Sequence, residues 1–152
     1  MKRVAVVGVT GSGKSTLAAE LARRLGAPYI ELDALQWGPG WAPCPRDQFR
    51  QRVAEVTAGE TWVTDGNYGE ARSILWTRAD TLVWLDYPLG LALWRLLGRT
   101  LRRVFTREEL WNGNRETFYG VFLAPDNLFA YAFVSQRRHR REYPQLLAQP
   151  EY

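Results

Sequence analysis

The sequence predicts a three-layer α/β fold, in which a small parallel sheet carries helices on both faces. Short β-branched or apolar runs alternate with helical patterns in units of about 30 residues. A glycine-rich loop follows the first run, and an aspartate follows each of the three later runs. Alternation at this length is typical of parallel strands joined by right-handed helical crossovers.

The first three elements are a strand, a helix and a second strand. Residues 3–7 form a strand because valines dominate a run that Gly8 ends. Residues 15–25 form a helix, with leucines at four-residue spacing and Gly26 as its C-terminal stop. Residues 28–32 form the second strand.

The middle of the chain continues the alternation. Residues 36–45 form a loop, since they contain three prolines and two glycines. Residues 46–58 form a helix with apolar side chains on one face. A third strand follows over residues 61–64, and a short helix covers residues 72–76.

The last elements include a segment without regular periodicity. Residues 81–85 form the fourth strand, and Pro88 opens a long helix rich in leucine and arginine. The pattern is irregular over residues 105–124, and a last helix covers residues 125–141. No linker or repeat interrupts residues 1–152, so we expect one domain.

Composition excludes several classes of protein. No run approaches the roughly 18 apolar residues of a membrane span, and no signal-peptide pattern is present, so we expect a cytoplasmic protein. The single Cys44 and single His139 cannot supply a zinc site of thiolates and imidazoles. Residues 1–90 carry ten basic and ten acidic side chains, whereas residues 91–152 carry ten and six, so the net charge of +4 lies in the C-terminal part.

The loop after the first strand has the pattern G-x-x-x-x-G-K-[ST], which predicts a nucleoside triphosphate site. Its glycines let backbone N–H groups surround phosphate oxygens at the start of a helix. The lysine bridges the β- and γ-phosphates, and the serine hydroxyl binds Mg²⁺. The predicted nucleotide-binding residues of this loop are Gly8, Gly11, Ser12, Gly13, Lys14, Ser15 and Thr16.

Two other nucleotide-binding folds fit the sequence poorly. A dinucleotide fold requires G-x-G-x-x-G, but Thr16 occupies the position of the third glycine. A GTPase requires an N-K-x-D segment, and the sequence contains none. The site is therefore predicted to bind ATP.

Three aspartates follow predicted strands, and the carboxyl ends of parallel strands meet at one edge of the sheet. Asp33 is a candidate general base for an acceptor hydroxyl, or a ligand of a Mg²⁺-bound water. Asp65 is a candidate metal group behind the serine. The alternative for each is a turn residue, which we favour for Asp86.

These motifs resemble those of the adenylate-kinase-like P-loop kinases over nearly the whole chain. More narrowly, they are similar to the bacterial adenylate-kinase-related ATPases labelled "DNA topology modulation protein". The resemblance implies a sheet of order 2-3-1-4-5, a substrate-side segment near residues 34–60 and a helical lid near residues 105–124. The segments that carry it are Glu31-Leu32-Asp33, Asp65-Gly66-Asn67-Tyr68, Leu85-Asp86-Tyr87-Pro88, Trp94 to Arg99 and Glu109 to Glu116.

The resemblance also implies roles for several arginines. Arg95 matches the arginine that lies on the adenine, Arg99 matches the one on the transferring phosphoryl group, and Arg72 matches the one that holds the acceptor side. Lid candidates are Arg103, Arg107 and Arg115. For Arg102 and Arg103 the alternative is a solvated helix face. Loop tryptophans, namely Trp37, Trp41 and Trp111, either stack on a ligand or pack in a core.

Two features depart from the resemblance. The Asp-Gly-Phe-Pro-Arg acceptor motif of adenylate kinases is replaced by the segment from Asp65 to Tyr68, so AMP is not the expected acceptor. No β-branched run follows Tyr152, where the family has a final strand and helix. We expect either a truncated or a naturally short form.

The leading hypothesis is a phosphotransferase that uses ATP and Mg²⁺ and transfers the γ-phosphoryl group to a small-molecule or nucleotide acceptor. Its catalytic candidates are Lys14, Asp33 and Arg99, and its metal candidates are Ser15, Asp33 and Asp65. The alternative is a nucleotide-dependent regulatory or nucleic-acid-associated ATPase, suggested by the basic residues 137–141. We expect that basic segment to be a solvated helix end that phosphoryl transfer does not need. A non-catalytic nucleotide-binding scaffold is a third hypothesis. The sequence predicts neither the acceptor nor the oligomeric state.

Overall fold

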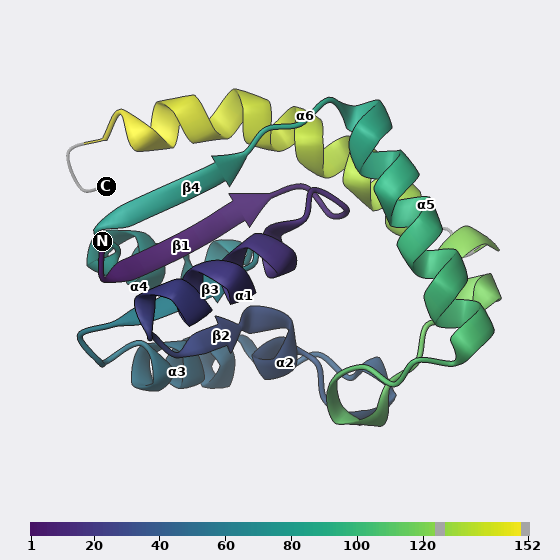
Figure 1. Ribbon diagram of the computed structural model, residues 1–152, viewed down its shortest axis with the longest axis horizontal. Helices are drawn as coiled ribbons and strands as arrows, with labels where there is room; N and C mark the ends of the chain where they lie inside the picture. Colours follow the sequence, from purple (N-terminus) through teal and green to yellow (C-terminus); the bar gives the residue numbers. More distant parts are fainter. Residues whose placement is uncertain (124–126, 150–152) are drawn as a thin grey trace.

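The computed structural model describes residues 1–123 and 127–149, and it confirms the predicted α/β fold with helices on both faces of a parallel sheet (Figure 1). The four strands are β1 (Arg3–Gly8), β2 (Tyr29–Glu31), β3 (Trp62–Asp65) and β4 (Thr81–Leu85). Their order is β2-β3-β1-β4, and all neighbours are parallel. Within the described residues no fifth strand extends this order.

The central strand β1 divides the core into two layers because successive side chains point to opposite faces. Val4 and Val6 pack with Ala18 and Ala22 of helix α1 (Lys14–Leu25). Ala5 and Val7 point the other way, into a second cluster. Helices α3 (Arg46–Val56), α4 (Gly69–Arg78) and α6 (Leu128–Leu147) supply that cluster.

Helix α5 (Leu89–Thr106) stands beyond the carboxyl edge of the sheet, where β1 and β4 point toward it (Figure 1). Its small or apolar buried positions, Ala92 and Leu96, pack against Val9 and against Ala132 of α6. This packing places one side of α5 over the glycine-rich loop. Among the described residues, no helix is both long enough and apolar enough to cross a membrane.

Most predicted boundaries differ from the structure by one to six residues, and two of the differences have a clear cause in the packing. The second strand ends at Glu31 instead of residue 32, because Leu32 turns into the core at 1% exposure and begins helix α2 (Leu32–Gln36). The last helix runs to Leu147 instead of residue 141. Tyr143, at 1% exposure, packs edge-on against Trp76 and Trp84 and so keeps the helix on the sheet.

The irregular segment predicted over residues 105–124 begins later than expected, since α5 continues to Thr106. It contains the 3₁₀ turn η2 (Trp111–Gly113) and the π-helical turn η3 (Tyr119–Leu123). A further 3₁₀ turn, η1 (Pro39–Trp41), interrupts the predicted loop 36–45. Residues 124–126 and 150–152, which belong to the predicted lid, last helix and single domain, lie outside the described residues.

Candidate active site at the carboxyl edge of the sheet

The glycine-rich loop between β1 and α1 adopts a backbone that only glycine accommodates. Gly11 has φ of +81°, and a Cβ there would lie 2.3 Å from the carbonyl oxygen of Ala92. Gly13 has φ of +91° and precedes α1, which has no side-chain cap. The first N–H groups of α1 therefore have no capping side chain, and they are available to an anion. Ser12 is buried beneath the loop, and Thr16 is exposed in the first turn.

Lys14 lies at the centre of the charged groups of this edge. Its Nζ donates a hydrogen bond to the carbonyl oxygen of Val9 at 3.0 Å. Burial lowers the pKa of Lys14 to about 8, although the nearby carboxylates of Asp65 and Asp33 act in the opposite direction. Arg99 lowers it further. The structure therefore brings together all three predicted catalytic residues.

Asp65, the last residue of β3, connects the loop to the sheet. One carboxylate oxygen accepts a hydrogen bond from the Ser15 hydroxyl at 2.5 Å, and the other accepts one from the Tyr29 hydroxyl at 3.1 Å. Burial raises the pKa of the Asp65 carboxyl, and the two hydrogen bonds oppose that shift. Because the Ser15 hydroxyl donates its hydrogen bond to Asp65, its oxygen lone pairs remain for a cation. Hydroxyl and carboxylate oxygens are ligands that suit Mg²⁺.

Asp33 is the second residue of α2 and not the end of a strand, as the sequence predicted. Its carboxylate accepts a hydrogen bond from the hydroxyl of Tyr68, which follows β3. Burial and the neighbouring Asp33 raise the pKa of Tyr68, so this phenol stays protonated as a donor. Asp33 thus still lies at the predicted edge, held from the side of β3.

Arg95 and Arg99 extend from α5 toward the same edge. The Arg95 guanidinium lies 5.0 Å from the ring centre of Tyr87, and its nitrogen lies 4.0 Å from the position of a Cβ on Gly13. Burial and the neighbouring Arg103 lower the pKa of Arg99. Within the described residues the Arg99 Nε atom is buried and has no hydrogen-bond partner. Both guanidiniums therefore have donors near the phosphate loop.

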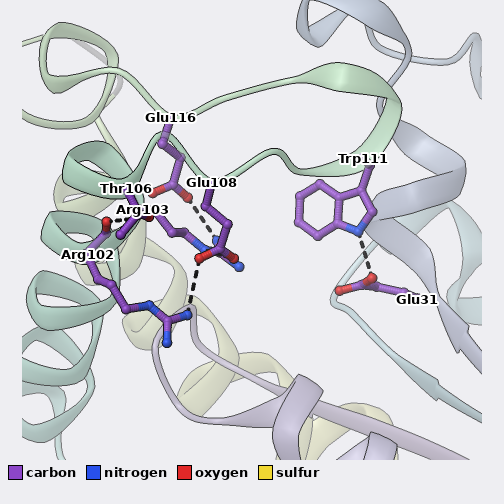
Figure 2. Close-up of polar contacts among 7 residues, drawn as sticks. All are labelled: Glu31, Arg102, Arg103, Thr106, Glu108, Trp111 and Glu116. Carbon is purple, nitrogen blue, oxygen red and sulfur yellow. Dashed lines mark hydrogen bonds and ion pairs between the residues drawn. The ribbon is translucent and has the colours of Figure 1, made fainter.

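The three predicted lid arginines lie in different surroundings. Arg103 is only 16% exposed and pairs with Glu116 at 3.0 Å and with Glu108 at 3.4 Å, so the solvated-face alternative is wrong for it (Figure 2). Arg107 ends α5 in a left-handed conformation and is exposed. Arg115 pairs with Glu109 at 3.5 Å. Of these three predicted lid arginines, Arg103 is the one whose charge lowers the pKa of Arg99.

The lid segment is attached to the predicted substrate-side segment. The side-chain amide of Asn114 is 4% exposed. It accepts a hydrogen bond from the backbone N–H of Trp41 at 2.9 Å and donates one to the Gly38 carbonyl at 2.9 Å. The Trp111 indole donates to Glu31 at 2.7 Å, as Figure 2 shows. Trp41 packs edge-to-face against both Trp37 and Trp111. The three half-buried tryptophans therefore form a cluster between two segments that are 70 residues or more apart in sequence.

We expect Asn114→Ala to release the lid from residues 37–43, because one buried amide makes two of the contacts between them. Hydrogen exchange should become faster in residues 37–43 and 111–115, and it should stay unchanged in an exposed-amide control, Gln48→Ala.

In the unaltered protein, exchange over residues 105–123 should slow when a non-hydrolysable ATP analogue binds. Equal exchange with and without the analogue would contradict a lid.

A cavity of about 600 Å³ opens beside the two residues that follow Gly66. Asn67 and Tyr68 form its inner wall, and Tyr68 is the donor to Asp33. Arg46, Arg72 and Arg138 line the rest, together with Glu70, Glu142 and Tyr131. Of the arginines in this lining, the sequence predicts only Arg72 on the acceptor side. Arg46 begins a helix and Arg138 belongs to the basic segment 137–141, and neither position carries a motif.

The basic segment 137–141 does not form one surface. Consecutive residues of a helix differ by about 100° in direction, so these side chains point around α6. Arg140 pairs with Asp86 at 2.8 Å, and Arg137 lies over the ring of Phe133. His139 is buried, and burial lowers its pKa to about 4.

Comparisons with solved structures agree with this fold. A shikimate kinase from Acinetobacter baumannii in complex with shikimate matches with a TM-score of 0.59 and 17% identity, over 95% of this chain and 79% of that one. A shikimate kinase from Bacteroides thetaiotaomicron matches with a TM-score of 0.57 and 19% identity, over 95% and 82%. The chain therefore has the fold of P-loop kinases. No family model and no curated protein matches the sequence.

Proposed function

We propose that this protein is an ATP-dependent phosphotransferase that acts on a small hydroxyl-bearing acceptor. The observation that carries the proposal is the position of Asp33, which lies near Lys14 and is bonded to Tyr68 in the wall of the cavity. A phosphoryl donor on the loop and an acceptor in the cavity would meet at this carboxylate. The bond between the γ-phosphorus and the bridging β-phosphate oxygen breaks, a bond between the acceptor oxygen and the γ-phosphorus forms, and ADP leaves.

Each residue of the chain has a distinct task in this proposal. Asp33 takes the proton of the acceptor hydroxyl, Lys14 binds the β- and γ-phosphates, and Arg99 stabilises charge on the transferring group. Ser15 and Asp65 would hold Mg²⁺, which neutralises phosphate charge when it is bound. Arg95, whose guanidinium lies over the ring of Tyr87, would stack on the purine, and a guanidinium plane favours adenine over guanine only modestly.

The cavity favours an acceptor with an anionic group. Three arginines and two glutamates line it, so the lining has a net positive charge. Arginine binds carboxylate or phosphate through parallel hydrogen bonds, and the carboxylates accept from hydroxyl or amino groups. The fold neighbour in complex with shikimate is a kinase of a small molecule, which supports an acceptor of this size.

The proposal is tested by ATP turnover with a panel of acceptors. The panel comprises hydroxy acids, sugar phosphates, amino-bearing polyols and nucleoside monophosphates, with a reaction without acceptor as the reference. We expect ADP formation to depend on one anionic hydroxyl compound and to match the amount of phosphorylated product. Turnover that DNA stimulates but that no small acceptor stimulates would favour a nucleic-acid-associated ATPase.

The second candidate is the nucleic-acid-associated ATPase that the narrower resemblance implies. Arginines 137 and 141 are exposed and remain available to phosphate backbones. Arg138 lines the cavity and Arg140 pairs with Asp86, so neutralising all four arginines would also disturb the kinase site. The Arg137→Gln, Arg141→Gln double variant separates the two functions, because it should leave acceptor-dependent transfer unchanged.

We expect Arg46→Gln and Arg138→Gln to raise the KM for the acceptor and to leave the KM for ATP unchanged. Both side chains are exposed at the cavity rim, so neither substitution disturbs the core. Losing a hydrogen bond to a charged group costs about 1.5–3 kcal/mol, which is about tenfold or more in affinity. Initial rates over both substrates measure the effect, with Arg137→Gln as control. A rise in the KM for ATP instead would place the acceptor elsewhere.

A further inference from the structure

Asn67 joins the phosphate loop to the acceptor side through one side chain. Its Oδ1 accepts a hydrogen bond from the backbone N–H of Gly8 at 3.0 Å, and its Nδ2 donates to the Gly8 carbonyl. The amide thus pairs with both polar groups of one residue, as a neighbouring strand does in a ladder. Gly8 is the last residue of β1 and the first of the loop.

Gly8 is a position where a small displacement has consequences. Its φ is +153°, and a Cβ there would lie 2.8 Å from the Leu85 carbonyl oxygen and 2.8 Å from the Ser12 hydroxyl. The close packing on that side leaves Gly8 little room to shift. Two hydrogen bonds from Asn67 fix it from the side of β3. The direction in which the chain leaves β1 therefore depends on Asn67.

The other side of Asn67 faces the acceptor cavity. Asn67 lines that cavity together with Tyr68, whose hydroxyl holds Asp33. Tyr143 of α6 lies behind it, with its hydroxyl 3.4 Å from Oδ1 and its ring stacked on His139. The amide therefore lies between the loop that binds the phosphoryl donor and the residues proposed to bind the acceptor.

We propose that Asn67 is a positioning residue that sets the phosphate loop in register with the acceptor cavity. The predicted effect of Asn67 on kcat rests on the proposed function, whereas its predicted effect on nucleotide binding does not. An amide is required because Gly8 presents one donor and one acceptor. A carboxylate at this place would accept from the N–H of Gly8 and would repel its carbonyl oxygen.

The test compares Asn67→Asp, Asn67→Ala and the unaltered protein. A loop displaced by about 1 Å costs on the order of 10²-fold in rate, so we expect kcat to fall by about that factor in both variants. The Kd of a non-hydrolysable ATP analogue should rise about tenfold or more, because the loop donors no longer converge on the phosphates. Both measurements are made well below the melting temperature, where a variant that has only lost global stability stays folded and keeps an unchanged Kd.

A pH series separates positioning from general damage. A protonated aspartic acid again has one donor and one acceptor, like the amide. The Kd ratio of Asn67→Asp to unaltered protein should therefore fall toward 1 on acidification, while the ratio for Asn67→Ala stays constant. Forming ratios at each pH removes the titration of the nucleotide and of Lys14 and Asp65 near the loop, which both proteins share.

The outcomes distinguish this inference from the proposed function. If no acceptor stimulates turnover but the Kd pattern and its pH rescue appear, the kinase assignment fails and the positioning role of Asn67 stands. If all three proteins bind the analogue equally at every pH, the positioning role is overturned. Gln145→Glu makes the same amide-to-acid change at an exposed position of α6 and should show no pH effect. Should Asn67→Asp fail to fold, Asn67→Ser provides the same Kd test.

Discussion

Replacing Lys14 with alanine or methionine is expected to abolish nucleotide turnover and to leave the fold intact. In the proposed site the ammonium group binds the β- and γ-phosphates, and removing one such preorganised charge costs on the order of 10²–10³-fold or more in rate. Thermal melting without nucleotide measures the fold. Addition of Mg-ATP should raise the melting temperature of the unaltered protein far more than that of the variants. Turnover at the unaltered rate in either variant would contradict the site assignment.

The methionine variant should also melt at a higher temperature than the unaltered protein at neutral pH, without nucleotide. Burial lowers the pKa of Lys14 from 10.5 to about 8, so the charged form is disfavoured in the folded state. Methionine keeps the apolar stem and removes the buried charge. A lower melting temperature for Lys14→Met would mean that the Val9 hydrogen bond outweighs this cost.

The same pKa shift predicts how stability depends on pH. Between pH 8 and 10.5 the unfolded chain holds a proton on Lys14 that the folded protein has released. Because the unfolded state then binds more protons, the free energy of unfolding rises with pH across this window. Tyrosines titrate in part of the same range, so the readout is the difference between the unaltered protein and Lys14→Met. That difference should shrink as the pH rises from 8 to 10.5, and parallel curves would contradict the assignment.

The sequence was most informative where local chemistry alone determines structure. Gly26 ends α1 in a left-handed conformation, as a C-terminal glycine predicts, and β4 has the predicted bounds. The phosphate loop was also predictable, because its backbone has positive φ angles and close contacts that require glycine. The lysine and serine of that loop therefore lie where the pattern placed them.

The sequence was least informative where partners come from distant segments. Asn67 contacts Gly8 across 59 residues, and Asn114 contacts Trp41 across 73. Both asparagines lie in segments that carry the family resemblance, but an asparagine in a loop is usually a turn residue, so neither amide indicated its distant partner. Arg138 was assigned to a solvated helix end, because which way a helix face points depends on packing and not on local pattern. Burial of Tyr143 fixes the orientation of α6 and brings Arg138 to the cavity.

The contacts of the lid bear on how the site would open. Trp111 bonds to Glu31, and burial raises the pKa of that carboxyl. Arg103 is meanwhile neutralised by Glu108 and Glu116 (Figure 2). A phosphate that draws Arg103 away from these carboxylates would therefore also act on the segment that carries Trp111. If residues 105–123 close as a lid, closure over the donor and closure over the substrate-side segment would be coupled, since the tryptophans join the two segments.

Asp33→Asn is expected to reduce phosphoryl transfer by about 10²–10⁴-fold, the usual contribution of a general base. The amide keeps the size of the carboxylate and can still accept from Tyr68, but it cannot take the proton of the acceptor hydroxyl. The Kd of a non-hydrolysable ATP analogue should change little, because the loop donors are untouched. Single-turnover rates at saturating acceptor measure the chemical step. Asp47→Asn, at an exposed position in the first turn of α3, is the matched control.

Tyr68→Phe separates the base from its support. This variant keeps the carboxylate of Asp33 and loses only the hydroxyl that orients it. We therefore expect a rate between those of the unaltered protein and Asp33→Asn. If Asp33 acts instead through a water on Mg²⁺, Asp33→Asn should be rescued in part by raised Mg²⁺ concentration, whereas loss of a base is not. Transfer at the unaltered rate in Asp33→Asn would exclude both roles for Asp33.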